Sequence, residues 1–383
     1  MILGPNRYTS GRIAVANLSA SIESLELRRV ERAAFEDLEA LSKLLFLRGD
    51  LLGRIVDHDR GEMVATEALA LSSSIGVALY IRARLAERFH RFEEASALLD
   101  RALATGHQRQ EIDVERAALL QATGRYGEAL ILRERLVKDD PGIHTLGALA
   151  SLLAEMDRWA AAETCYAAAL DADDEGISPL PCGQLLFEWG VSAMRRGELD
   201  RAEAILAELD AILPQHVPGR GHRAEVALAR GQLEVAAALI TPLLGTSDDP
   251  EYRAVYAEIL TARRDSKAAS EAERAAAAYE LLLARRPEAY ADHAAAFFMG
   301  VGSRPQRAVE LALANRKIRD TPRSRKLLAK ALGKAQQVSL SRAGTDATAS
   351  PSRIPIPDLE PAHYADAADF DGGMPTLVRG GNP

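Results

Sequence analysis

The feature that most constrains this chain is an alanine that recurs at steps of 34, 33, 40 and 34 residues. The alanines are Ala95, Ala129, Ala162, Ala202 and Ala236. A residue suited to a turn stands five positions before each of them: His90, Gly124, Asp157, Gly197 and Gly231. A regular period of this length is typical of an array in which one small structural unit is stacked many times.

Each copy of the repeat also carries apolar residues at fixed distances from its alanine. Three positions before it stand Phe92, Tyr126, Trp159, Leu199 and Leu233, and seven positions after it stand Ala102, Leu136, Ala169, Leu209 and Leu243. The fourth position after it holds Leu99, Tyr166, Leu206 and Ile240, and only Arg133 departs from the pattern. The spacing predicts two helices that cross closely at the alanine, with bulky residues filling the space beside it and the turn residue ending the first helix.

The composition favours helices throughout. Aromatic residues make up only 5% of the 383 residues, and no segment alternates polar and apolar residues with the valine and isoleucine content of strands. We therefore expect an all-α fold, built as one extended array that buries its apolar residues between neighbouring units.

The set of positions resembles the tetratricopeptide repeat, whose copies of about 34 residues form two antiparallel helices. The signature of the family's first helix is degenerate here, and Trp189-Gly190 with Ala193 is its nearest match. The resemblance covers roughly residues 35–337 and implies a right-handed α-solenoid of antiparallel helix pairs, of the bacterial type with degenerate repeats.

Spacing and composition divide the chain into five segments. We expect an N-terminal extension at 1–20 and an irregular helical pair at 21–75. Five clear repeats follow at 76–250, interrupted by an insertion at about 171–183. Irregular repeats and a capping helix occupy 251–338. Residues 339–383 are rich in Pro, Gly, Ser and Asp and are expected to be a disordered tail.

Helix ends are also predicted in the irregular segments. In the first pair, Leu38, Leu41 and Leu45 share one helical face, and Gly49 is expected to end that helix. A later pair centres on Ala308, and the capping helix is expected to begin with Thr321 as its N-cap.

The charge and the cysteines exclude several classes of protein. A formal net charge of -8 argues against a nucleic-acid or anionic-membrane binder, because both need a concentrated basic surface. Cys165 and Cys182 stand alone, so neither a disulfide framework nor a metal site is expected. No segment has the long apolar run of a secretion signal or a membrane span. We expect a cytoplasmic protein with no cofactor.

Catalytic motifs are absent from the sequence, so no enzyme is expected. The acidic pairs Glu93-Glu94, Asp139-Asp140 and Asp173-Asp174 are interpreted as solvated residues at helix starts and turns. The segment QHVPGRGHR, between Gln215 and Arg223, has two interpretations: a turn between repeats, or an anion site formed by backbone amides before a helix.

The resemblance implies that partners bind in a groove lined by the first helix of each pair. It assigns to that groove Tyr80, Arg84, Arg88, Phe187, Val191, Arg195, Tyr252, Val255, Ile259, Tyr290, His293 and Phe297, together with Glu111, Val114, Gln121, His144, Ser151, Met194 and Arg263. The second half of the groove is predicted to be apolar and aromatic, as suits a peptide with hydrophobic anchors. The alternative is that several of these side chains form the core between helices.

The expected function is that of a non-catalytic scaffold or adaptor that holds a peptide segment of an unknown partner protein in this groove. The alternative is a regulatory or sensory subunit that controls an enzyme or a transcription factor. Nine Lys or Arg residues lie between Arg316 and Arg342, and acidic residues follow between Asp358 and Asp371. This charge pattern predicts that the chain's own C-terminal tail docks on the capping helix or in the groove.

Overall fold

The computed structural model describes residues 8–173 and 177–345. These residues form eighteen α-helices and one short 3-10 helix, with no strand among them, which confirms the all-α class. The helices are α1 (Gly11–Glu31), α2 (Phe35–Leu52), α3 (Ile55–Leu71), α4 (Ile75–Arg88), α5 (Phe92–Ala104), α6 (Arg109–Ala122), α7 (Tyr126–Asp139), α8 (Ile143–Glu155), α9 (Trp159–Asp171), α10 (Pro179–Arg196), α11 (Leu199–Ile212), α12 (Val217–Ala229), α13 (Leu233–Ile240), the 3-10 helix (Thr241–Gly245), α14 (Pro250–Ala262), α15 (Ala268–Arg285), α16 (Pro287–Met299), α17 (Pro305–Ile318) and α18 (Pro322–Thr345).

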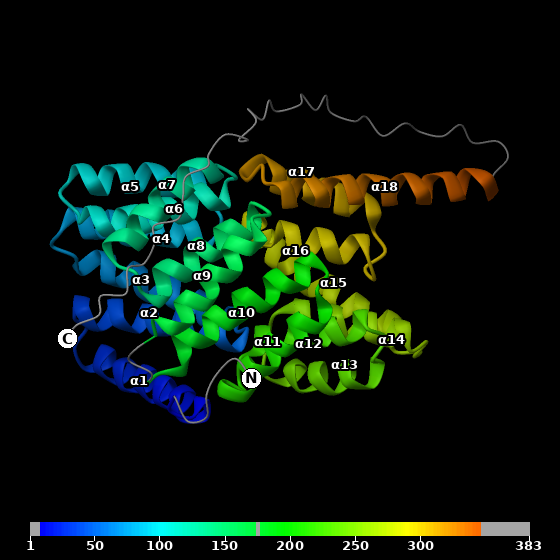
Figure 1. The fold of residues 1–383 in the computed structure, drawn as a ribbon, viewed down its shortest axis with the longest axis horizontal. Helices are drawn as coiled ribbons and strands as arrows, with labels where there is room; N and C mark the ends of the chain where they lie inside the picture. Colours follow the sequence, from blue (N-terminus) through cyan, green and yellow to red (C-terminus); the bar gives the residue numbers. More distant parts are fainter. Residues whose placement is uncertain (1–7, 174–176, 346–383) are drawn as a thin grey trace, which may run out of the picture. The chain divides into compact units, whose positions relative to one another are not determined.

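Consecutive helices pack in pairs, from α2 with α3 to α16 with α17, as Figure 1 shows. We call the first helix of each pair helix A and the second helix B, so that α2, α4, α6, α8, α10, α12, α14 and α16 are helices A. Helices A of neighbouring pairs also contact each other, among them α4 with α6, α8 with α10 and α10 with α12. The predicted array of antiparallel helix pairs is therefore present, and its helices A share one face.

The recurring alanine lies in helix B at the closest contact of each pair. The five alanines and Ala308 are all at most 1% exposed. The turn residue before each of them has a positive φ, between 57° and 85° for the five clear repeats, and Ser303 takes the same role before Ala308 with a φ of 50°. A left-handed residue ends helix A and reverses the chain. The alanine thus lies at the crossing of the two helices, and the turn residue ends helix A, as their spacing predicts.

The first pair ends differently from the prediction. Leu38, Leu41 and Leu45 are buried as expected, but α2 continues through Gly49 and ends at Gly53, whose φ is 58°. A Cβ atom on Gly49 would overlap the ring of His58 in α3. Gly49 therefore permits the close approach of α2 and α3, and the helix end falls to the next glycine.

The N-terminal segment contains more structure than an extension. Helix α1 begins at Gly11 and buries Leu18, Ile22 and Leu25. A Cβ atom on Gly11 would overlap the carbonyl oxygen of Ile212, at the end of α11. The first helix thus packs against an element 200 residues later in the sequence.

The insertion between the third and fourth clear repeats lengthens a helix. Part of it forms the first turn of α10, which has 18 residues, and residues 174–176 lie outside the described residues. Asp173 is buried and accepts a hydrogen bond of 2.7 Å from the hydroxyl of Tyr8, so the interpretation of this residue as solvated is wrong. Glu93, Glu94, Asp139 and Asp140 are exposed, as expected.

The last helix begins as predicted. The backbone N–H of Ser324 donates to the Thr321 hydroxyl at 3.1 Å, and the N–H of Thr321 donates to the Ser324 hydroxyl at 3.0 Å. This reciprocal cap satisfies two groups that would otherwise lack partners at the helix start. Helix α18 runs to Thr345, beyond the expected start of the tail at 339, and the remaining tail residues lie outside the described part of the chain.

Segments about 190 to 230 residues apart meet in what we call the closing contact. The carboxylate of Asp248 accepts hydrogen bonds from the N–H groups of Ile55, at 2.6 Å, and Val56, at 3.0 Å, which are the first two residues of α3. The guanidinium of Arg286 forms an ion pair of 2.8 Å with Asp59 and lies 3.8 Å from the ring centroid of Phe89. These bonds join the first pairs of the array to α14, α15 and α16.

The chain divides into two compact units, residues 1–335 and 336–383. All the contacts above lie within the first unit. Within the described ranges, no helix combines the length and apolarity that crossing a membrane requires.

Candidate functional site

The twelve residues predicted to line the groove all lie on helices A. Tyr80, Arg84 and Arg88 belong to α4, and Phe187, Val191 and Arg195 to α10. Tyr252, Val255 and Ile259 belong to α14, and Tyr290, His293 and Phe297 to α16. The assignment of these residues to one type of helix agrees with the structure, but their side chains have different surroundings.

The three side chains of α4 engage neighbouring helices. The hydroxyl of Tyr80 donates to Glu115 at 3.0 Å, and the guanidinium of Arg84 lies 3.1 Å from the same carboxylate. Arg88 donates two hydrogen bonds to Asp50, at 2.8 and 3.0 Å. These cations and the phenol are therefore already satisfied by the protein.

The second half of the face is not the apolar groove that the sequence predicts. Tyr252, Val255, Ile259 and Phe297 are at most 5% exposed, and Val191 on α10 is 7% exposed. Their apolar surface packs between helices, because each helix A must also bury a stripe against its own helix B. For these five residues the structure supports the alternative, in which they belong to the core.

In the second half of the helix A face, the accessible side chains include charged groups. The imidazole Nδ1 of His293 lies 3.4 Å from the Glu251 carboxylate. Asp292 and Glu251 raise the pKa of His293 to about 10, because both carboxylates favour the protonated ring. Asp292 is itself buried and paired with Arg319. Tyr290 is half-buried beside these groups.

Phe187 is half-buried between two histidines of the QHVPGRGHR segment. Its ring centroid lies 5.1 Å from that of His216 and 5.5 Å from that of His222. The Nδ1 atom of His216 accepts the Gly219 N–H at 2.9 Å, so this ring caps α12. Burial lowers the pKa of His216 to about 4. Because the segment's own histidine uses the amide of Gly219, the structure favours the interpretation of this segment as a turn and helix start.

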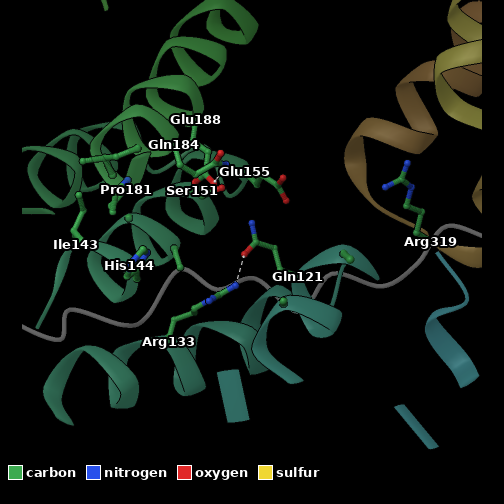
Figure 2. A pocket seen from close by; sticks show the side chains of 15 residues that line it. Gln121, Arg133, Ile143, His144, Ser151, Glu155, Pro181, Gln184, Glu188 and Arg319 are labelled. Atoms are coloured by element: carbon green, nitrogen blue, oxygen red, sulfur yellow. Dashed lines mark hydrogen bonds between the residues drawn. The ribbon is translucent and has the colours of Figure 1, made fainter. Parts of the chain in front are cut away.

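A cavity of about 370 Å³ opens on the helix A face between α6, α7, α8 and α10 (Figure 2). It is lined by Ala118, Gln121, Ala122, Arg133, Ile143, His144, Gly147, Ala148, Ser151, Glu155, Pro181, Gln184, Leu185, Glu188 and Arg319. Gln121, His144 and Ser151 are among the groove positions that the resemblance implies. The cavity is therefore the candidate site.

Arg133 supplies the cation on one side of this cavity. It occupies the position of helix B at which the other clear repeats carry a buried Leu, Tyr or Ile. Its guanidinium donates one long hydrogen bond, of 3.4 Å, to Gln121, and its Nε atom is buried without a partner among the described residues. Burial lowers the pKa of Arg133, because the charged form loses solvation there.

Two carboxylates stand on the other side. Figure 2 shows Glu155 and Glu188, with Gln184 and Ser151, across from Arg133 and Gln121. Glu188 accepts a hydrogen bond of 2.9 Å from Gln184. Burial raises the pKa of Glu188, and the nearby charge of Glu155 adds to the same effect. This site thus presents opposite charges from opposing helices.

Sequence reasoning missed the charged members of this site. The signal for Arg133 was present, because it alone breaks the apolar pattern of its position. Glu155 and Glu188 gave no such signal, since single carboxylates on helices are common surface residues.

The repeat geometry agrees with a match between residues 193–259 and a family model described as tetratricopeptide repeat. Residues 193–259 are thus tetratricopeptide repeat sequence. The matched segment runs from the end of α10 to α14, and the same alanine and turn positions recur in the pairs before and after it.

Three solved structures resemble this chain at low sequence identity. A tetratricopeptide repeat protein from Parabacteroides merdae is 18% identical, with 78% of this chain and 98% of that chain covered and a TM-score of 0.43. PilW, a type IV pilus biogenesis factor, is 19% identical, with coverages of 56% and 96% and a TM-score of 0.42. Yeast Tom70 is 14% identical, with coverages of 80% and 66% and a TM-score of 0.47. None of the curated proteins matches the sequence.

Proposed function

We propose that this protein is a non-catalytic scaffold that binds a segment of a partner polypeptide on its helix A face, at the cavity between α6, α7, α8 and α10. Repeat arrays of stacked helix pairs typically act through extended binding surfaces, and this family is typically non-catalytic. The observation that carries the proposal is the cavity itself. It combines groove positions on three helices A with charged groups that the protein leaves without ion pairs among its described residues.

A peptide is the ligand class that fits a site of this form. The lining of the cavity combines amide, hydroxyl and charged side chains with Ala, Leu and Ile. Extended polypeptide offers backbone donors and acceptors together with side chains at regular spacing, and so can use both kinds of surface. Volumes of about 300–1,000 Å³ are common for ligand sites.

A displayed library of random peptides tests the proposal without knowledge of the partner. Peptides enriched on the full chain are synthesised, and amide hydrogen exchange is measured with and without the peptide. We expect slower exchange in α6, α8 and α10. Protection confined to exposed faces of the B helices, such as that of α5 around Glu93, would contradict the proposal.

Docking of the chain's own C-terminal tail remains a second proposal, since residues 346–383 lie outside the described residues. It is supported by the opposite charges of the capping helix and the tail sequence. Removal of residues 341–383 should raise the affinity for a library-derived peptide if the tail competes for the same surface. An unchanged affinity would exclude this competition.

A further inference from the structure

Three charged side chains that line the cavity have no direct counter-charge. Within the described part of the chain, Arg133, Glu155 and Glu188 form no ion pair, whereas Arg319, which also lines the cavity, pairs with Asp292. Arg133 and Glu188 attract each other across the cavity, but no ion pair joins its two sides among the described residues.

Burial makes this arrangement costly. It raises the pKa of Glu188 and lowers the pKa of Arg133, both of which are half-buried, so each of these charged forms has lost solvation without gaining an ion pair, whereas Glu155 is exposed. A ligand that supplies the missing counter-charges would regain that free energy. Partly buried charges that await a partner are typical of binding sites.

The positions of the charges select the ligand. Arg133 projects from α7 on one side, and Glu155 and Glu188 project from α8 and α10 on the other (Figure 2). Arg319, at the end of α17, also lines the cavity, but it is already paired with Asp292. The site therefore offers one unpaired cation on one side and two unpaired carboxylates on the other.

A ligand of a single charge sign fits this arrangement poorly. A phosphate or another multiply charged anion near Arg133 would face the carboxylates of Glu155 and Glu188, and a polyamine near those carboxylates would face Arg133 and Arg319. An unpaired Arg opposite two unpaired Glu is best matched by a ligand that carries both signs at a short separation.

We propose that the cavity recognises a mixed-charge peptide segment, in which an acidic side chain pairs with Arg133 and a basic side chain of the same segment pairs with Glu155 and Glu188. This inference rests on the proposed function and specifies the chemistry of its ligand. The bidentate geometry of a guanidinium favours a carboxylate at Arg133, and each pairing forms charge-assisted hydrogen bonds.

The experiment uses four fluorescein-labelled nonapeptides of equal length and otherwise identical sequence. One carries an Asp and a Lys separated by two alanines, one carries two Asp, one carries two Lys, and one carries Asn and Gln. Fluorescence anisotropy with the full chain should show that the Asp–Lys peptide binds about tenfold more tightly than each of the others. Equal affinities for all four peptides, or no binding by any of them, would overturn the inference.

Arg133→Leu is the decisive variant, because Leu is the residue type that this position carries in another repeat, at Leu99. We expect the variant to melt at the same temperature as the parent chain or higher, and to lose the tenfold preference for the Asp–Lys peptide. Arg125→Leu is the matched control, since Arg125 is an exposed arginine of the same repeat that pairs with Glu128 at 2.6 Å. It should keep the preference.

The outcomes separate this inference from the function on which it rests. If Arg133→Leu lowers the melting temperature and leaves the peptide preference intact, Arg133 is a structural residue and the inference is wrong. If library-derived peptides protect α6, α8 and α10 but show no mixed-charge preference, the scaffold proposal stands and only the ligand chemistry fails. If those peptides protect other surfaces, both proposals fail.

Discussion

The closing contact can be broken at one carboxylate. Asp248 accepts the N–H groups of Ile55 and Val56, and the residue at the N-cap of α3, Arg54, offers no side-chain hydrogen bond. The start of α3 is thus capped by a residue from the loop before α14. Asp248→Ala removes this cap and leaves two backbone donors without their protein partner.

The structure gives the expected magnitude. Loss of an acidic N-cap costs about 1–2 kcal/mol of stability, and the favourable charge at the positive end of the helix dipole is lost with it. Urea denaturation should report this decrease in the free energy of unfolding. Amide hydrogen exchange should show that the N–H groups of Ile55 and Val56 exchange about tenfold faster, because a local cost of about 1.4 kcal/mol corresponds to one factor of ten.

Two controls isolate the cap from a general effect of charge. Asp248→Asn keeps an oxygen acceptor and should retain most of the stability. Asp100→Ala removes a carboxylate whose side chain is 68% exposed and which pairs with Arg116 at 2.6 Å, so its cost should remain below about 0.5 kcal/mol. Unchanged exchange at Ile55 and Val56 in Asp248→Ala would refute the reasoning, since the closing contact would then not hold α3.

Three further predictions concern the first unit. Arg48→Met breaks the buried ion pair with Asp57 and should lower the free energy of unfolding, measured by urea titration, by about 3 kcal/mol. This value is at the low end for a broken buried ion pair, because other arginines remain near the Asp57 carboxylate. Adding Asp57→Leu should recover part of the loss. Burial lowers the pKa of His216 to about 4, so the buried neutral ring contributes stability that is present above the unfolded pKa of about 6.5 and is lost as the pH falls toward 4. His216→Asn should remove this pH dependence of the free energy of unfolding. The same dependence of stability on pH in both proteins would exclude this role of His216. Gly124→Ala should cost more than Gly197→Ala, because both glycines have a φ near 85° but only Gly124 faces a backbone oxygen that a Cβ would overlap; equal melting temperatures for the two variants would contradict this.

Local spacing predicted the parts of the fold that neighbours in sequence decide. The alanine of helix B and the turn residue before it are required by the packing of two helices that are consecutive in the chain. Their regular spacing is therefore visible in the sequence although the other positions of the repeats vary. Even the departure at Arg133 was visible, because the surrounding positions kept the pattern. Gly49 was misassigned because a glycine that ends a helix and one that admits a neighbouring ring, here His58, look the same in sequence.

The candidate site was predicted less well. Each helix A buries one stripe of residues against helix B and exposes a second stripe on the binding face. Residues of the two stripes are neighbours in the sequence. In the irregular repeats the apolar signal marked the buried stripe, so Tyr252, Val255 and Ile259 were assigned to the groove although they are core residues. The accessible residues beside them, including Glu251, are charged and carry no periodic signal.

The sequence by itself determined that this chain is an array of helix pairs, where most pairs turn, and which small residue lies at each crossing, because these depend on contacts between helices that are consecutive. Only the tertiary structure decided which charges face the cavity without a partner and that Asp248 caps a helix some 190 residues earlier. Such contacts depend on the sum of small rotations between successive pairs, and no single repeat encodes that sum.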